Sequence, residues 1–152
     1  MRVIVQRVLE ASVTVKNKKV GEIGRGVMLL VGFTEGDNSE TIRKMVDKIL
    51  KLRIFDDEKG VMNKSILDTP DTAILSVSQF TLYADTTKGN RPSYIKALRG
   101  EEAIKLYEEF NMQLKEYIKV ETGIFGEDMK VKLINDGPIT ITLEREWLYV
   151  KK

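Results

Sequence analysis

The sequence has 152 residues, of which 42% are hydrophobic and 32% are charged, with a formal net charge of +2. This balance favours one globular domain, residues 1–152, whose core is large enough to fold without a metal or a disulfide. The chain contains no cysteine and no histidine, which excludes Ser-His-Asp catalysis, Cys-His catalysis and the usual zinc sites. We recognise no signal peptide and no apolar run long enough to cross a bilayer, so we expect a cytoplasmic protein.

The first third of the chain predicts an antiparallel meander. Valine and isoleucine dominate residues 3–15, which we expect to form a long strand with a possible bulge at Ala11 and Ser12. Two further strands, residues 20–23 and the wholly apolar run 27–33, follow after short turns. Short connections of this kind are typical of neighbouring antiparallel strands.

The next segment predicts an amphipathic helix. Asp37 and Glu40 stand at the spacing of a capping box. Apolar residues then recur at the spacing of one buried helical face. These residues are Ile42, Met45, Val46, Ile49 and Leu50. A brief strand at residues 53–55 and an acidic turn through Gly60 are expected to follow.

The second half of the chain predicts further strands and helices. In chain order we expect a strand at 73–80, an exposed loop at 84–92, a short helix at 92–98, a longer helix at about 101–119, and two strands at 129–134 and 139–143 around a turn. Within the first of these strands, Ala73, Leu75 and Val77 would share one face.

The strand at 73–80 ends in the polar motif Ser78-Gln79-Phe80-Thr81. Ser78 and Phe80 would point to one face of the sheet, and Gln79 and Thr81 to the other. Such a strand end offers hydroxyl and backbone donors at a sheet rim, where ligands often bind. It is also typical of an edge strand whose serine and threonine face water, and the spacing alone favours this second interpretation.

Asn135-Asp136-Gly137-Pro138-Ile139-Thr140 is the strongest turn signal in the sequence. Gly137 tolerates backbone angles that other residues avoid, and Pro138 lacks an N–H group. Residue statistics favour a trans bond before Pro138. Taken alone, the motif is interpreted as an ordinary hairpin loop.

Two other segments contain residues suited to RNA. Lys88 and Arg91 lie in a loop with a glycine and an aromatic residue, and they would either contact phosphate or remain solvated. Phe125 lies in the segment Gly123-Ile124-Phe125-Gly126, between two glycines. Its ring would either stack on a base or fill the core where a helix returns to a strand.

Taken together and in this order, these segments resemble the D-aminoacyl-tRNA deacylase family over nearly the whole chain. The matching motifs are Val5-Gln6-Arg7-Val8, Met62-Asn63-Lys64-Ser65, residues 78–85, the loop at 88–93, Thr122-Gly123-Ile124-Phe125-Gly126 and residues 135–140. One departure is Asn90, where the family pattern leads us to expect a second arginine beside Arg91.

The resemblance implies an α/β fold of the α+β type, in which mixed, largely antiparallel sheets form a barrel-like sandwich with helices packed outside. It also implies a homodimer that needs no cofactor and hydrolyses the ester between a D-amino acid and the terminal adenosine of tRNA. In the family the bond before Pro138 is cis, and the Gly137-Pro138 motif crosses into the partner's site at the aminoacyl-tRNA 3′ end. Its carbonyl oxygens would exclude L side chains, whereas glycine, and therefore glycyl-tRNA, should pass.

The resemblance also implies roles for individual residues. Backbone N–H groups near Phe80 and Thr81 would stabilise the oxyanion, and the ribose 2′-hydroxyl or a water that it orients would assist attack. The Thr81 hydroxyl is a poor nucleophile here, because the chain has no histidine to act as its base. Ser78 and Gln79 would hold polar groups of the substrate, and Phe125 would pack against adenine.

Arg7 completes the predicted site, as an anchor for the partner's Gly137-Pro138 segment. Two alternatives stay open. The chain could be a non-catalytic RNA-binding module that uses Lys88, Arg91 and Phe125, or it could bind a small molecule in a polar pocket at a strand end.

Overall fold

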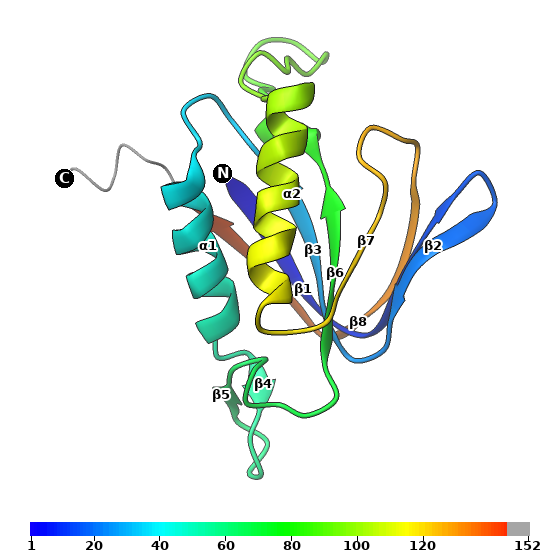
Figure 1. Ribbon diagram of the computed structural model, residues 1–152, viewed down its shortest axis with the longest axis vertical. Helices are drawn as coiled ribbons and strands as arrows, with labels where there is room; N and C mark the ends of the chain where they lie inside the picture. Colours follow the sequence, from blue (N-terminus) through cyan, green and yellow to red (C-terminus); the bar gives the residue numbers. More distant parts are fainter. Residues whose placement is uncertain (146–152) are drawn as a thin grey trace.

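The computed structural model describes residues 1–145, which form a curled mixed sheet with two helices packed against one face (Figure 1). The strands are β1 (Arg2–Val15), β2 (Lys18–Ile23), β3 (Gly26–Gly32), β4 (Phe55–Asp56), β5 (Met62–Lys64), β6 (Ala73–Ser78), β7 (Val120–Thr122) and β8 (Lys130–Glu144). The helices are α1 (Ser39–Lys51), α2 (Glu101–Lys115) and the single 3-10 turn η1 (Phe80–Tyr83). No helix among these residues is long and apolar enough to cross a membrane.

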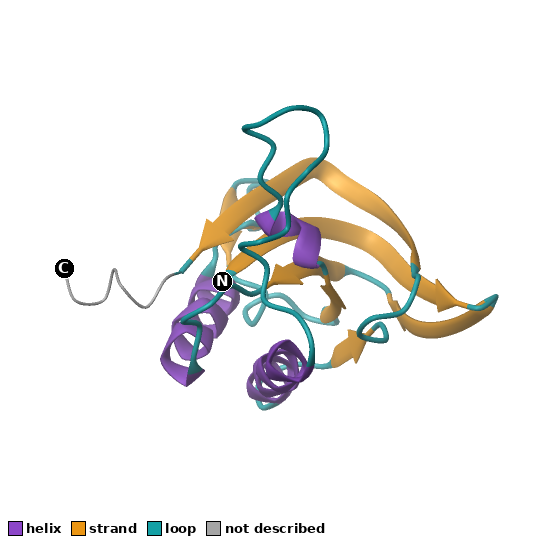
Figure 2. Cartoon of the chain, turned by 90° about the horizontal axis from the view of Figure 1, so that it is seen from above, coloured by secondary structure: helices purple, strands orange, loops and turns teal. Residues whose placement is uncertain are grey.

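β1 organises the sheet, because it forms hydrogen bonds along both of its edges. On one edge its first half pairs with β3 and its second half with β2, and on the other edge β8 runs along its whole length, all antiparallel. β3, β6 and β7 are parallel neighbours. The sheet is therefore mixed and largely antiparallel, and it curls into a nearly closed, barrel-like form with both helices outside (Figure 2). The predicted fold class is confirmed.

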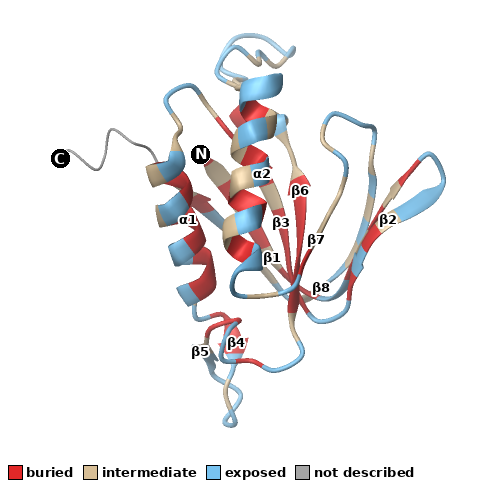
Figure 3. Ribbon diagram, viewed as in Figure 1, coloured by how far each residue is buried: buried red, intermediate tan, exposed pale blue. Residues whose placement is uncertain are grey.

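Apolar side chains pack on both faces of this sheet, and Figure 3 marks much of β3 and β6 as buried. The larger cluster lies between the sheet and the helices, and the smaller one lies inside the curl and includes Ala73, Leu75 and Val77, as predicted. β3 contributes to both, with Leu29 in the first cluster and Met28 in the second. Burial on both faces explains why β3 is an unbroken apolar run in the sequence.

α1 presents the predicted apolar face to the core, but its predicted cap is wrong. The cap is Asn38, whose Oδ1 accepts from the N–H groups of Glu40 and Thr41 at 3.0 and 3.1 Å, while Thr41 Oγ1 accepts from Asn38 N–H at 2.7 Å. Asp37 is already used by the preceding turn. Its carboxylate accepts from Thr34 N–H at 2.8 Å and from the N-terminal ammonium of Met1 at 2.9 Å.

Three predicted boundaries in the second half also change. The strand predicted at 73–80 ends at Ser78, because the chain turns into η1. No helix forms at 92–98: Asp85 and Ser93 exchange two backbone hydrogen bonds of 2.8 Å, which commit this segment to a closed loop. α2 ends at Lys115 rather than near residue 119. Just after this end, the N–H groups of Tyr117 and Ile118 both donate to the carbonyl oxygen of Leu114.

The predicted hairpin around residues 135–138 is wrong, because both flanking segments belong to one strand, β8, and pair with β1. Gln6 lies opposite Thr140 and Val8 opposite Asn135, so residues 136–139 bulge out opposite Arg7. Asn135 closes the bulge: its Oδ1 accepts from Ile139 N–H at 2.7 Å, and its Nδ2 donates to Ile139 O at 3.1 Å. The peptide bond between Gly137 and Pro138 is cis, which agrees with the family resemblance and not with residue statistics.

Candidate active site

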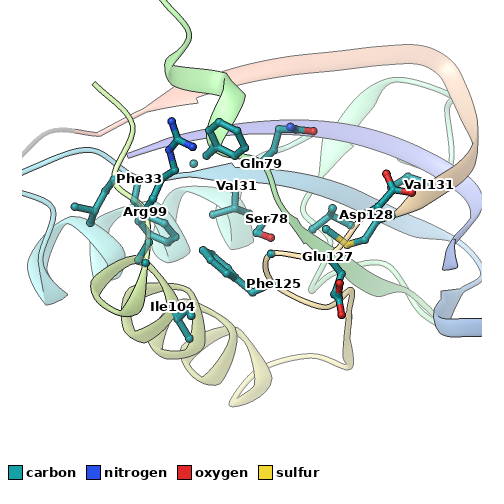
Figure 4. Close-up of a pocket in the computed structure, with 18 residues that line it drawn as sticks. Val31, Phe33, Ser78, Gln79, Arg99, Ile104, Phe125, Glu127, Asp128 and Val131 are labelled. Carbon is teal, nitrogen blue, oxygen red and sulfur yellow. The ribbon is translucent and has the colours of Figure 1, made fainter. Parts of the chain in front are cut away.

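An open cavity of about 580 Å³ lies where the ends of β3 and β6 meet the start of α2 and the loop after β7 (Figure 4). Val31 and Ser78 come from the two strand ends, Ala103 and Ile104 from the first turns of α2, and Phe125 from the loop. Its walls are thus mainly apolar, with polar groups at the end of β6 and charged side chains at Arg99, Glu127 and Asp128. A lining of this kind is typical of a pocket that binds a small or terminal chemical group.

The chain changes from strand to 3-10 turn at Gln79, on the wall of the cavity. Gln79 N–H donates to Val31 O at 2.7 Å, which holds the turn against β3. The neighbouring position in β3 must be glycine, because a Cβ on Gly32 would lie only 2.9 Å from Gln79 O. The first N–H groups of a helical turn have no acceptor within it, so those of Phe80 and Thr81 are donors that η1 itself does not use.

The first predicted motif does not lie on one extended strand, so its expected alternation of faces stops at Ser78. Ser78, Gln79 and Phe80 line the cavity, whereas Thr81 is not part of its wall in the described part of the chain. The Thr81 hydroxyl instead accepts a hydrogen bond from Gln79 Nε2 at 2.6 Å. This contact fixes the Thr81 side chain against its own turn.

The Phe125 ring packs against the core, which agrees with one of the two interpretations that the sequence left open, and it also lines the cavity. Stacking on a base stays a prediction. The centroid of the Phe125 ring lies 5.8 Å from that of Tyr107 in α2, at an interplanar angle of 48°. Tyr107 is buried and its hydroxyl donates to Ser76 O in β6 at 2.7 Å. Burial raises the pKa of the Tyr107 phenol. No motif in the sequence indicates this polar link.

Two residues that contact Phe80 were not predicted as site residues. The ring of Tyr94 meets the ring of Phe80 edge to face, with centroids 5.1 Å apart. The guanidinium of Arg99 lies over Phe80, with Cζ 4.5 Å from the ring centroid, and it lies 5.6 Å from the Tyr94 centroid. Arg99 is one of 25 basic residues in the chain, and no motif distinguishes it, so only the folded structure reveals this position.

Arg7 is buried beneath the bulge in β8 and holds it from within the same chain. Its Nε donates to Asp136 O at 3.0 Å, and its Nη1 donates to Ile54 O at 2.7 Å. Gly137 and Pro138 are exposed at the tip of the bulge. Within one protomer they do not line the cavity formed by Ser78, Gln79, Phe80 and Phe125.

The remaining predicted binding residues lie outside the cavity wall. Lys88 and Arg91 are exposed on the loop between η1 and α2, and neither lines the cavity. No group of three or more His, Cys, Asp or Glu side chains within residues 1–145 is arranged to hold a metal ion.

Comparison with known proteins identifies the family. A family model described as D-Tyr-tRNA(Tyr) deacylase matches residues 4–144. The chain is 54% identical over 145 residues to a D-aminoacyl-tRNA deacylase of Bacillus velezensis, covering 95% of this chain and 98% of that protein. It is 53% identical over 146 residues to a D-aminoacyl-tRNA deacylase of Flavobacterium johnsoniae, covering 95% and 97%.

Solved structures agree with this result. The c-Myc DNA Unwinding Element Binding Protein superposes with a TM-score of 0.89 at 42% identity, covering 95% of this chain and 98% of that one. A probable eukaryotic D-amino acid tRNA deacylase superposes with a TM-score of 0.80 over 93% and 97%, and its 22% identity supports the shared fold alone. The chain therefore belongs to the D-Tyr-tRNA(Tyr) deacylase family, whose members at 53–54% identity are named D-aminoacyl-tRNA deacylases.

Proposed function

We propose that this protein hydrolyses the ester bond of D-aminoacyl-tRNA, releasing the free D-amino acid and tRNA in the cytoplasm. The observation that carries the proposal is the cavity itself: in a chain of this family, the motif from Ser78 to Phe80 faces Phe125 across a space of about 580 Å³. A cavity of this size suits a terminal nucleoside with its attached aminoacyl group.

Stabilisation of the oxyanion is assigned to backbone N–H groups. Attack on the ester carbonyl places negative charge on its oxygen, and prepositioned N–H donors stabilise that charge. The N–H groups of Phe80 and Thr81 at the start of η1 are suited to this role. The Thr81 hydroxyl accepts from Gln79 Nε2, and the chain offers no histidine to take its proton. Attack on the carbonyl carbon is therefore assigned to a water, assisted by the 2′-hydroxyl of the terminal ribose. The bond between the acyl carbon and the ribose oxygen then breaks, and the ribose oxygen leaves as a hydroxyl with a proton from that water.

Substrate binding falls to the side chains of the cavity. Phe125 would pack against the adenine, supported from behind by the ring of Tyr107. Ser78 and Gln79, which line the cavity beside Phe80, would hold polar groups of the substrate. These assignments follow the family resemblance, and the position of Ser78, Gln79 and Phe125 around one cavity supports them.

Selection of the D form is assigned to Gly137 and Pro138 of a second copy of the chain. In the proposed homodimer, each bulge enters the partner's cavity and turns its carbonyl oxygens toward the α-carbon of the substrate. An L side chain would strike this backbone, a D side chain would point outward, and mischarged glycyl-tRNA would be accepted. Two features support this arrangement: the bulge tip is exposed, and Arg7 and Asn135 hold its base in place.

The direct test is release of D-tyrosine from D-tyrosyl-tRNA. We expect release by the wild type, a large loss for Phe125→Ala, and no loss for Met112→Ala, a matched truncation at a position on α2 that is 68% exposed and outside the cavity. Binding without release would instead favour the alternative function, a non-catalytic RNA-binding module. The dimer is tested by sedimentation, which should give twice the 17.3 kDa of one chain.

A further inference from the structure

We infer that Arg99 binds a phosphate group of the single-stranded 3′ end of the tRNA at the mouth of the cavity. This inference rests on the proposed function, since it requires the aminoacylated end of tRNA to enter the cavity beside Phe80. It concerns binding of the nucleic acid and adds no step to the chemistry.

The position of Arg99 is fixed by aromatic contacts. It lies in the cavity wall just before α2 begins (Figure 4). Its guanidinium carbon lies 4.5 Å from the centroid of Phe80 and 5.6 Å from that of Tyr94. A guanidinium that stacks on an aromatic face keeps its N–H donors in its own plane and available to other groups. Phe80 and Tyr94 therefore orient a cation without using its hydrogen-bonding capacity.

The charge of Arg99 has no anionic partner among residues 1–145. The ion pairs of this part of the chain include Arg2 with Glu144, Arg7 with Asp56 and Asp136, and Arg43 with Glu40, but none includes Arg99. The hydrogen bonds formed by side chains of these residues also include none from the Arg99 guanidinium. The fork of a guanidinium matches the oxygens of a phosphate, so an available one at the mouth of a site favours an anion.

The charges around the cavity favour one side for that anion. Glu127 and Asp128 lie in the wall across from Arg99 (Figure 4), and their carboxylates lie 3.9 Å from Lys16 Nζ and 2.8 Å from Lys130 Nζ. A phosphate near these two carboxylates would meet repulsion, whereas near Arg99 it would meet an available cation. The backbone of the entering strand is therefore expected to pass on the Arg99 side.

The geometry of the substrate places a phosphate at this point. If the terminal nucleoside occupies the cavity, the phosphodiester that joins it to the preceding nucleotide lies at the mouth, where Arg99 is held. The sequence continues with Glu101 and Glu102 in the first turn of α2, so the site offers one cationic contact and not a broad basic patch. The expected effect of removing Arg99 is accordingly that of losing a single phosphate contact.

The test compares the salt dependence of KM for D-tyrosyl-tRNA among three variants and the wild type. Each phosphate contact to a single strand adds about 0.7 to the slope of log affinity against log salt. Arg99→Gln should reduce the steepness of this fall by about that amount. Raising salt from about 50 to about 200 mM should therefore weaken tRNA binding by the variant ~2.6-fold less than binding by the wild type. Its KM at low salt should be higher and its kcat unchanged.

Two controls separate charge from packing. Arg99→Lys keeps the cation and should keep most of the slope, although it loses the fork. Arg43→Gln removes an exposed arginine that pairs with Glu40 on α1, outside the cavity, and should leave the slope unchanged. With D-tyrosyl-adenosine, which has no phosphate, Arg99→Gln and the wild type should have the same KM.

Either of two results would overturn the inference. The first is an Arg99→Gln slope equal to that of the wild type. The second is a fall in kcat with no change in KM, which would mean that Arg99 acts only by packing against Phe80. If the wild type hydrolyses D-tyrosyl-tRNA and Arg99→Gln gives either result, the inference alone is refuted. If the wild type releases no D-tyrosine, the proposed function and the inference are refuted together.

Discussion

Replacing Arg7 by methionine removes the group that holds the bulge in β8. The Arg7 guanidinium donates from Nη1 to Ile54 O at 2.7 Å and from Nε to Asp136 O at 3.0 Å. Methionine occupies much of the volume of the arginine stem but has no donor. Both carbonyl oxygens therefore lose their partner, and the contact at Ile54 is buried, where water cannot replace it without cost.

The expected loss of stability follows from these contacts. Hydrogen bonds from charged donors contribute about 1.5–3 kcal/mol each. The two ion pairs of Arg7, at 3.5 Å to Asp56 and Asp136, add little, because those carboxylates are 48% and 36% exposed. We therefore expect Arg7→Met to lower the free energy of unfolding by about 3–5 kcal/mol.

Equilibrium unfolding in urea at one fixed protein concentration measures this loss, since the stability of the proposed dimer would depend on concentration. Arg53→Met is the matched control: Arg53 donates to Asn63 O at 2.8 Å, but on an exposed surface, so its loss should stay below about 1 kcal/mol. If Arg7→Met and Arg53→Met had the same small effect on the free energy of unfolding, the claim that Arg7 holds the bulge in place would be refuted. Discrimination between D and L substrates by Arg7→Met should also fall, because the loosened bulge carries Gly137 and Pro138.

Three further substitutions test other parts of the account. Thr81→Ala should keep kcat within about tenfold of the wild type, because the proposed mechanism assigns oxyanion stabilisation to the backbone; complete loss in a folded variant that still binds tRNA would contradict this. Gly137→Ala should relax discrimination between D and L substrates or damage the site, because φ is +142° and a Cβ would lie 2.7 Å from Ile139 Cγ1; unchanged D-selectivity would rule out backbone exclusion. Tyr107→Phe should cost about 1–2 kcal/mol at neutral pH, since it removes the donor to Ser76 O. Burial raises the Tyr107 pKa above its ordinary 10.0. The stabilising contribution of the Tyr107 phenol is therefore complete below pH 10 and is lost as the pH rises through the raised pKa. Above pH 10 the wild type should lose more stability than Tyr107→Phe, and equal losses would contradict this.

The sequence predicted the elements whose signal is local and periodic. The apolar face of α1 was visible as spacing, and the burial of β3 was visible as an unbroken apolar run. The cap of α1 was misplaced by one residue, because Asp37 and Asn38 are both good caps and only the folded chain brings the Met1 ammonium to Asp37. A local pattern cannot reveal a partner that lies 36 residues away.

The hairpin prediction failed for a similar reason. The residues around Gly137 form a strong turn signal, but β1 is long enough to pair with the segments on both sides of them. Pairing with β1 keeps both segments in one strand and makes the turn a bulge. The site shows the same limit: the motif from Ser78 to Thr81 was found from sequence, whereas Arg99 reaches it only because the loop before α2 folds over Phe80.

The central claim is that the protein removes D-amino acids from tRNA and spares L-amino acids. The most direct measurement is the ratio of kcat/KM for D-tyrosyl-tRNA to that for L-tyrosyl-tRNA, with spontaneous hydrolysis subtracted. Steric exclusion by a rigid backbone predicts a ratio above about 100. Equal rates of release from the two substrates would contradict the account.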